Sequence, residues 1–207
     1  MDILYQDDRI VVAVKPVGVL STDEPGGMPE LLRAQLHTDS LRTVHRLDAQ
    51  VSGVMVFALL PQQFRERRFT KEYLAVLCGT PSQSSGSLTD LLARDPQRRL
   101  TYVADTPSPS AREARLSFAT VDSSDGMTLV RVRLHTGRTH QIRVQFASRG
   151  LPLAGDRKYG ASDAPYPIAL WSCRLSFVHP QTGEPETFTC PPPDTAPWDL
   201  VPLPEML

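Results

Sequence analysis

The 207-residue chain has few cysteines and no long apolar run. Its three cysteines, Cys78, Cys173 and Cys190, lie far apart without a C-x-x-C pair, which argues against both a disulfide framework and a structural zinc site. No apolar stretch approaches the ~20 residues that span a bilayer, and no N-terminal stretch has the basic, apolar and small-residue order of a signal peptide. We therefore expect a soluble, cytoplasmic protein whose thiols are reduced.

A strong charge of either sign is also missing. The formal net charge is −1 at pH 7, which argues against a protein that coats nucleic acid indiscriminately. The charge is nevertheless uneven, because the residues after Arg174 hold five acids and no Lys or Arg, so that residues 1–174 carry +4 and the remainder −5. The larger part of the chain can therefore form a locally basic face.

The apolar patterning predicts an α+β fold. With 41% hydrophobic residues, the chain can bury one substantial core, so we expect a single domain over residues 1–207, with room for two lobes and with residues 191–207 as a proline-rich, acidic C-terminal tail. Hairpin turns at Asp125-Gly126 and at residues 179–184 predict a mixed, largely antiparallel central sheet. Its strands are predicted at residues 8–14, 54–60, 71–78, 115–121, 128–134, 169–178 and 186–190.

Three helices are expected to flank this sheet. One covers residues 29–37, one begins at Pro61, and one runs from an N-cap at Thr139 to Gly150. Residues 80–111 are rich in Pro, Ser, Gly, Asp and Arg with little periodicity, which predicts a loop. The helix from Pro61 leads through a basic cluster of Arg65, Arg67, Arg68 and Lys71.

One carboxylate stands out by its position. The run His45-Arg46-Leu47-Asp48 precedes a small-residue turn and a predicted apolar strand. A carboxylate at the mouth of a buried strand loses hydration, which disfavours its charged form unless a cation compensates. Arg138 and Arg143, in a second conspicuous segment, are the candidate cations, and Asp48 is the candidate site of chemistry.

Each of these candidates also has an ordinary structural explanation. Taken alone, Asp48 is most simply a turn residue or helix cap, and Tyr73 on an alternating strand is most simply a core residue. Arg143 in a first helical turn could pair with a surface acid. The histidines at positions 37, 45, 135 and 140 show no recognised metal-ligand spacing, so no metal site is predicted.

Three blocks of sequence together resemble the RluA-type family of RNA pseudouridine synthases. They are His45-Arg46-Leu47-Asp48 with Ser52-Gly53, then Lys71-Glu72-Tyr73, then Gly137-Arg138-Thr139-His140-Gln141-Ile142-Arg143-Val144. Three flanking motifs extend the likeness over most of residues 1–190; they are Lys15-Pro16-x-Gly18, Gly155-Asp156-x-x-Tyr159-Gly160 and His179-Pro180-x-Thr182-Gly183-Glu184. Two departures are Val51, where the family more often has threonine, and Trp171-Ser172, where a leucine-histidine pair is commoner.

The resemblance implies the pseudouridine synthase catalytic-domain fold with an RNA-binding cleft, in a stand-alone form without the small N-terminal RNA-binding domain of many relatives. It implies isomerisation of uridine to pseudouridine in structured RNA, either transfer RNA or ribosomal RNA, with the target nucleotide flipped out of its stack. It implies no metal and no organic cofactor. A monomer is the simplest expectation, because the sequence shows no heptad run.

The resemblance also implies a role for individual residues. Asp48 is the catalytic carboxylate, Tyr73 offers a ring and a hydroxyl to the uracil, and Arg143 pairs with Asp48, with Arg138 as its rival. Attack at C1′, attack on the uracil ring and a glycal route all stay open. The residues expected to contact the RNA substrate are His45, Arg46, Lys71, Arg138, Thr139, Gln141 and Ile142.

Two other functions would use the same residues. A non-catalytic RNA-binding or ribosome-assembly module would keep the fold without isomerising, and the modest charge and Val51 are compatible with it. A glycosidase would use the carboxylate to release free uracil. Asp48, Tyr73 and Arg143 occurring together favour the synthase over both.

Overall fold

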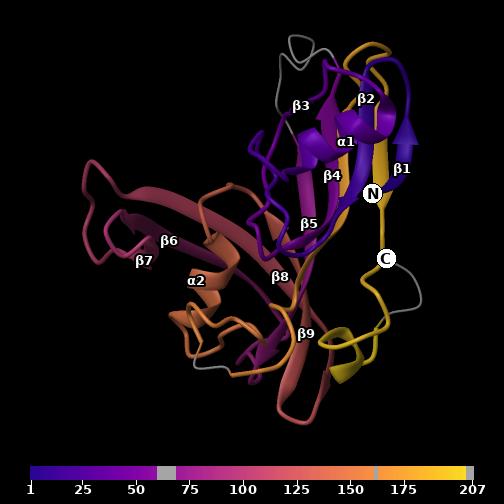
Figure 1. The fold of residues 1–207 in the computed structure, drawn as a ribbon. Helices are drawn as coiled ribbons and strands as arrows, with labels where there is room; N and C mark the ends of the chain where they lie inside the picture. Colours follow the sequence, from indigo (N-terminus) through magenta and orange to yellow (C-terminus); the bar gives the residue numbers. More distant parts are fainter. Residues whose placement is uncertain (60–68, 161–162, 204–207) are drawn as a thin grey trace. The chain divides into compact units, whose positions relative to one another are not determined.

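The computed structural model describes residues 1–59, 69–160 and 163–203, and the chain divides into two compact units (Figure 1). Unit 1 comprises Met1–Lys71 and Trp171–Pro192, and unit 2 comprises Glu72–Leu170 and the segment from Pro193. Each unit contains its own set of strands and its own core cluster. The expectation of a single domain over residues 1–207 stays a prediction.

Unit 1 is built on strands in the order β1-β2-β4-β10, with β3 added to β4 and β11 added to β10. Strand β4 runs parallel to β10, whereas the β1–β2, β2–β4, β3–β4 and β10–β11 pairs are antiparallel. The mixed, largely antiparallel arrangement predicted from sequence is confirmed here. The strands are β1 (Asp2–Gln6), β2 (Ile10–Lys15), β3 (Arg42–Thr43), β4 (Ser52–Ala58), β10 (Leu170–Val178) and β11 (Pro185–Thr189).

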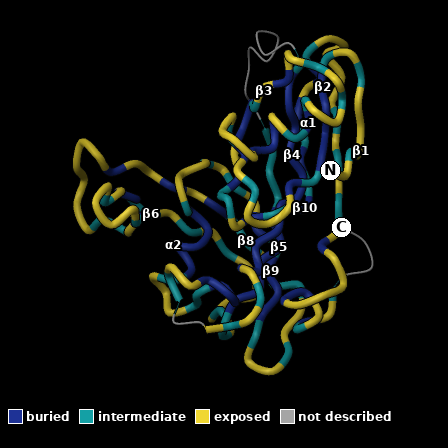
Figure 2. Tube along the Cα trace, viewed as in Figure 1, coloured by how far each residue is buried: buried dark blue, intermediate teal, exposed yellow. Residues whose placement is uncertain are grey.

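The core of unit 1 follows from the apolar strands β2 and β4. Nearly all of their residues are buried and are coloured dark blue in Figure 2, and continuous apolar runs are expected of strands that are covered on both sides. The helix α1 (Met28–Leu36) ends at His37, whose left-handed φ of 52° stops it. One core cluster consists of Ile10, Val12, Val44, Val54, Val56, Ala58, Leu175 and Phe177.

Unit 2 contains strands in the order β5-β9-β8-β6-β7 and the α-helix α2 (Gln141–Ala147). The hairpin predicted at Asp125-Gly126 is confirmed, and both residues have the positive φ that the turn requires. The helix packs on this sheet through Val144, which contacts Leu92 and Ala114. The strands are β5 (Thr70–Cys78), β6 (Ser85–Asp95), β7 (Leu100–Val103), β8 (Arg112–Ser124) and β9 (Met127–Leu134).

Two of the predictions for unit 2 are wrong. Residues 80–111 are not a loop, because they contain β6 and β7, which pair with each other. Thr139 is not the N-cap of the helix, which begins at Gln141 after His140. In the C-terminal tail, Trp198 is 5% exposed and starts a short 3-10 helix, Trp198–Leu200.

Two further expectations concern helices. The helix predicted from Pro61, with Arg65, Arg67 and Arg68 of the basic cluster, lies outside the described residues. No helix within the described ranges combines the length and the apolar character that crossing a bilayer needs.

Candidate functional site

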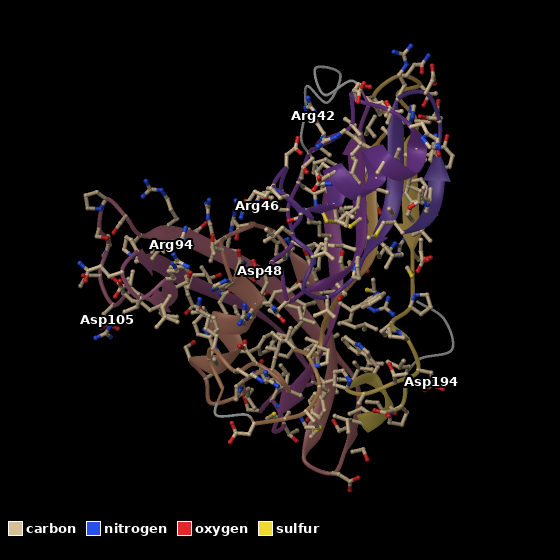
Figure 3. All side chains as sticks on the ribbon, viewed as in Figure 1. Arg42, Arg46, Asp48, Arg94, Asp105 and Asp194 are labelled. Carbon is tan, nitrogen blue, oxygen red and sulfur yellow. The ribbon has the colours of Figure 1, made fainter. Side chains whose placement is uncertain are left out.

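Asp48 lies in the loop between β3 and β4, and this loop is fastened to the segment that follows β2. The hydroxyl of Ser21 donates to the carbonyl of Leu47 at 2.6 Å and accepts from the Leu47 amide at 3.3 Å. The amide of Val51 closes a turn onto the carbonyl of Asp48 at 3.0 Å. Main-chain groups on both sides of Asp48, which is labelled in Figure 3, are therefore held, while Asp48 is partly buried.

Lys15 also binds this loop, through the carbonyl of Ala49, and is fully buried. Its ammonium donates to three carbonyl oxygens, those of Pro16 at 2.8 Å, Val19 at 2.6 Å and Ala49 at 2.9 Å. Burial lowers the pKa of Lys15 to about 8, and the negative charge of Asp48 opposes that shift. A buried cation whose charge interacts with that of Asp48 is therefore present in unit 1 itself.

Gly53 brings the start of β4 against β10. Its φ is 116°, and a Cβ at this position would lie 2.3 Å from the carbonyl oxygen of Ser172, so only glycine fits. Ser172, one of the departures from the family pattern, donates its hydroxyl to the carbonyl of Val54 at 3.1 Å. Trp171 donates its indole N–H to the carbonyl of Cys190 at 2.8 Å. Both residues of the Trp171-Ser172 departure are thus accommodated by bonds to main-chain carbonyls.

Three predicted RNA-contacting residues of unit 1 differ in exposure. Arg46 is exposed, whereas His45 is 8% exposed and accepts the amide of Val56 at 3.2 Å through Nε2. Burial, followed by the charge of Lys71, lowers the pKa of His45 well below its ordinary value, so this histidine is neutral. The ammonium of Lys71 lies 5.7 Å from the centre of the Phe69 ring, and burial lowers the pKa of Lys71 to about 8.

Arg143 is a buried cation of unit 2. Its Nε and Nη2 donate to Oδ2 and Oδ1 of Asp156 at 2.8 and 2.7 Å, and the two side chains are 6% and 0% exposed. Burial by itself would raise the pKa of Asp156, but the hydrogen bonds and charge of Arg143, with the amides of Lys158 and Tyr159, lower it. The result is a buried, two-pronged ion pair.

Other predicted residues of this segment are used to build the loop before α2. Gln141 is 3% exposed, and its side-chain oxygen accepts the Thr136 hydroxyl at 2.8 Å and the Arg138 amide at 3.0 Å. Ile142 is buried, while Thr139 is exposed. Arg138 is exposed as well and donates its Nε to the carbonyl of Glu113 at 2.9 Å.

The predicted site residues fall into the two units. Unit 1 contains Asp48 with His45, Arg46 and Lys71, and unit 2 contains Arg143 with the segment from Arg138. Tyr73, which is 5% exposed on β5, also belongs to unit 2. The pairing of Asp48 with Arg143 or Arg138 stays a prediction.

Sequence reasoning did not assign roles to Lys15, Asp156 or Tyr159, although it quoted the motifs that contain them. A signal for Lys15 was available, since a lysine that directly extends an apolar strand is a candidate for burial. For Asp156 there was none, because its partner comes from a different element. Among the described residues, no group of three or more His, Cys, Asp or Glu side chains could hold a metal ion.

Comparison with known proteins gives consistent matches to one family. A family model described as RNA pseudouridylate synthase matches residues 9–148. The dual-specificity RNA pseudouridine synthase RluA of Escherichia coli strain K12 is 35% identical over 91% of this chain and 92% of its own length. A protein of Aquifex aeolicus strain VF5, named an uncharacterized RNA pseudouridine synthase, is 33% identical over 94% of this chain and 70% of its own length.

Solved structures agree on the fold. Human RNA pseudouridylate synthase domain containing 1 superimposes with a TM-score of 0.79 at 24% identity, covering 94% of this chain and 84% of its own. Human RNA pseudouridylate synthase domain containing 4 gives a TM-score of 0.74 at 24% identity, with 93% and 88% covered. The α+β fold expected from the sequence is thereby confirmed.

Proposed function

The chain belongs to the RNA pseudouridylate synthase family and is an RNA pseudouridine synthase, and from that premise we propose that Asp48 is its catalytic carboxylate. Tyr73 and Arg143 complete the proposed catalytic group. The observation that carries the proposal is the fastening of the Asp48 loop, in which Lys15 and Ser21 hold the main chain at Ala49 and Leu47. A loop fixed on both sides of a half-exposed carboxylate orients that carboxylate in advance of substrate binding.

In the isomerisation, the C1′–N1 glycosidic bond breaks, the uracil turns, and a C5–C1′ bond forms. The proton on C5 is lost and N1 ends with a proton, so the step is balanced without an oxidant or a further reactant. A carboxylate can attack C1′, attack the ring, or remove a sugar proton on the glycal route. Asp48 is the carboxylate that we propose for whichever of these routes the enzyme follows.

The substrate that we propose is a structured transfer RNA or ribosomal RNA. The relative from Escherichia coli is named dual-specificity, which supports keeping both classes. A stacked uridine must be flipped into the site at a cost of a few kcal/mol. The ring of Tyr73 would stack on the flipped base, and exposed Arg46 would fill the space it leaves. A cytoplasmic location and a monomeric state stay predictions.

Tritium release from RNA labelled at C5 of uridine tests the proposal directly. We expect Asp48→Asn to lower turnover by about 10⁴-fold or more while RNA binding persists, because the variant keeps the size of the side chain and removes its charge. Asp8→Asn is the matched control, since the Asp8 side chain is 74% exposed. Turnover by Asp48→Asn at the rate of the control would refute the role of Asp48.

The RNA target is found by mapping pseudouridines after carbodiimide treatment. Total RNA from a strain lacking the gene is compared with RNA from the same strain complemented by wild type or by Asp48→Asn. A position that is modified only with the wild-type protein identifies the substrate. If no position in transfer RNA or ribosomal RNA differs, the proposed substrate class is wrong.

A further inference from the structure

We propose that Tyr159 and His140 are positioning residues for Arg143. The inference rests on the proposed function of Arg143 and adds how its guanidinium is kept in one orientation. All the residues concerned belong to unit 2.

Two surfaces of the Arg143 guanidinium are fixed by neighbours from the turn at residues 156–160. Asp156 takes the edge formed by Nε and Nη2. The ring of Tyr159 lies against the guanidinium, with its centre 5.1 Å from Cζ, a distance at which a cation and an aromatic face attract. Because the group is planar, an edge contact and a face contact together define the direction in which its other edge, formed by Nη1 and Nη2, points.

The ring of Tyr159 is itself held at its hydroxyl. The amide of Thr101 on β7 donates to this oxygen at 3.0 Å, and Nδ1 of His140 lies 2.6 Å from it. His140 directly precedes α2, the helix that carries Arg143. The hydroxyl therefore joins the strand, the residue before the helix and the ring that covers the guanidinium.

The arrangement depends on the backbone conformation of His140, which the sequence alone does not reveal. His140 has a left-handed φ of 56°, which is unusual for a residue other than glycine and is tolerated well by asparagine. This conformation ends the loop and starts the helix at Gln141. A strained residue whose side chain bonds to a ring over a proposed catalytic arginine is a positioning device rather than a surface contact.

The ring and the hydroxyl of Tyr159 can be tested separately. Tyr159→Phe keeps the ring, which also packs against a core cluster of Leu92, Ala114 and Val144, and removes the hydroxyl alone. We expect kcat for pseudouridine formation to fall by roughly 10-fold to 10²-fold, since small misplacements of catalytic groups have effects of this size, while KM for RNA stays within about two-fold. Tyr102→Phe, at a half-exposed tyrosine on β7, is the control and should keep wild-type kcat.

Substitutions at His140 supply a rescue test. Asparagine places a polar atom where Nδ1 lies and tolerates the positive φ, whereas glycine tolerates the φ without any side chain. We expect His140→Asn to retain a higher kcat than His140→Gly, at similar melting temperatures. A purely structural role predicts that the two variants lose kcat equally, or only in step with their melting temperatures.

The outcomes separate this inference from the role of Arg143. If Arg143→Lys loses activity while Tyr159→Phe and His140→Gly keep wild-type kcat, Arg143 is needed and the positioning inference is overturned. If Arg143→Lys keeps wild-type kcat, both are overturned. Loss of kcat in all three, with KM maintained and with rescue by His140→Asn, supports the inference.

Discussion

The two units of this protein each bury a cation beside a proposed catalytic element, and they stabilise it in different ways. In unit 1 the ammonium of Lys15 is surrounded by three main-chain carbonyls. In unit 2 the guanidinium of Arg143 is matched by the carboxylate of Asp156. The first arrangement spreads the charge over dipoles, and the second neutralises it with an opposite charge.

The difference determines which substitutions each unit tolerates. The acceptors of Lys15 are carbonyls of Pro16, Val19 and Ala49, so they do not depend on the side chains at those positions. The carboxylate of Asp156 that accepts from Arg143 belongs to a side chain, and changing that one residue removes it. Removing one partner of a buried ion pair is costly, so unit 2 should be the more sensitive to a single substitution.

The largest effect is therefore expected for Asp156→Asn, with a loss of about 3–5 kcal/mol in the free energy of unfolding of unit 2. The variant keeps the shape of the side chain and leaves the charge of Arg143 buried. The two tryptophans report on the units separately, because Trp171 lies in unit 1 and Trp198 in unit 2. The loss is measured by urea unfolding, followed by tryptophan fluorescence in a Trp171→Phe background that leaves Trp198 as the remaining tryptophan. A cost near zero would show that the ion pair does not order unit 2.

Lys15→Met should cost less, about 2 kcal/mol in unit 1. Methionine fills the same space and removes the penalty for burying an ammonium, but it leaves carbonyl groups without their donor, at about 1–3 kcal/mol for an unsatisfied group. Tryptophan fluorescence during urea unfolding, in a Trp198→Phe background, measures this cost. Lys158→Met, at an exposed lysine, is the control.

We also expect Lys15→Met to lower kcat, because the carbonyl of Ala49 next to Asp48 loses its donor. A kcat equal to that of the control would show that Lys15 does not contribute to catalysis.

Both predictions depend on contacts that local sequence patterns do not contain. The strands of unit 1 could be predicted because β2 and β4 are continuous apolar runs, and the hairpin at Asp125-Gly126 because those residues favour positive φ. Strand β6 was missed because Asp90 interrupts its alternation. Asp90 is satisfied by Gln145 at 2.7 Å and Arg149 at 3.0 Å, which come from α2 and the residues after it, so its burial becomes visible only in the folded chain.

The candidate site, like the fold, could be predicted only where it depends on local sequence. The motif around Asp48 is local, and the structure fastens that loop as a fixed element of unit 1. The partners that stabilise the cations are not local, since Asp156 lies 13 residues beyond Arg143 and Ala49 lies 34 residues beyond Lys15. Sequence reasoning could therefore name Asp48 and Arg143, but not Lys15 or the groups that stabilise the two cations within each unit.

The stability of unit 2 should depend on pH in the acidic range, and that of unit 1 in the alkaline range. The folded pKa of Asp156 lies below its ordinary value of 3.8, so its stabilisation is complete above that value and is lost as the pH falls below it. The folded pKa of Lys15 is about 8 instead of 10.5, so the unfolded state binds more protons between these values and unit 1 gains stability as the pH rises through them. The slope for one proton is at most about 1.4 kcal/mol per pH unit.

Substitution isolates each contribution to this pH dependence. Subtracting the unfolding profile of Asp156→Asn from that of wild type should give a difference that shrinks in acid. The corresponding subtraction for Lys15→Met should give a difference that changes only on the alkaline side. An acid-dependent difference for Lys15→Met would contradict the assignment of this pH dependence to the burial of Lys15.

The smallest effect is expected at an ion pair of unit 1 that is also two-pronged but lies in a different environment. Arg33 donates to both carboxylate oxygens of Asp23, at 3.0 and 2.6 Å, yet the Asp23 side chain is 43% exposed. Solvent screens such a pair, so Asp23→Asn should cost less than about 1 kcal/mol and still less in 1 M salt. The cost of Asp156→Asn should hardly change with salt. If the two substitutions cost the same, the bidentate geometry rather than burial would set the strength of these pairs, and the contrast between the two units would rest on the wrong property.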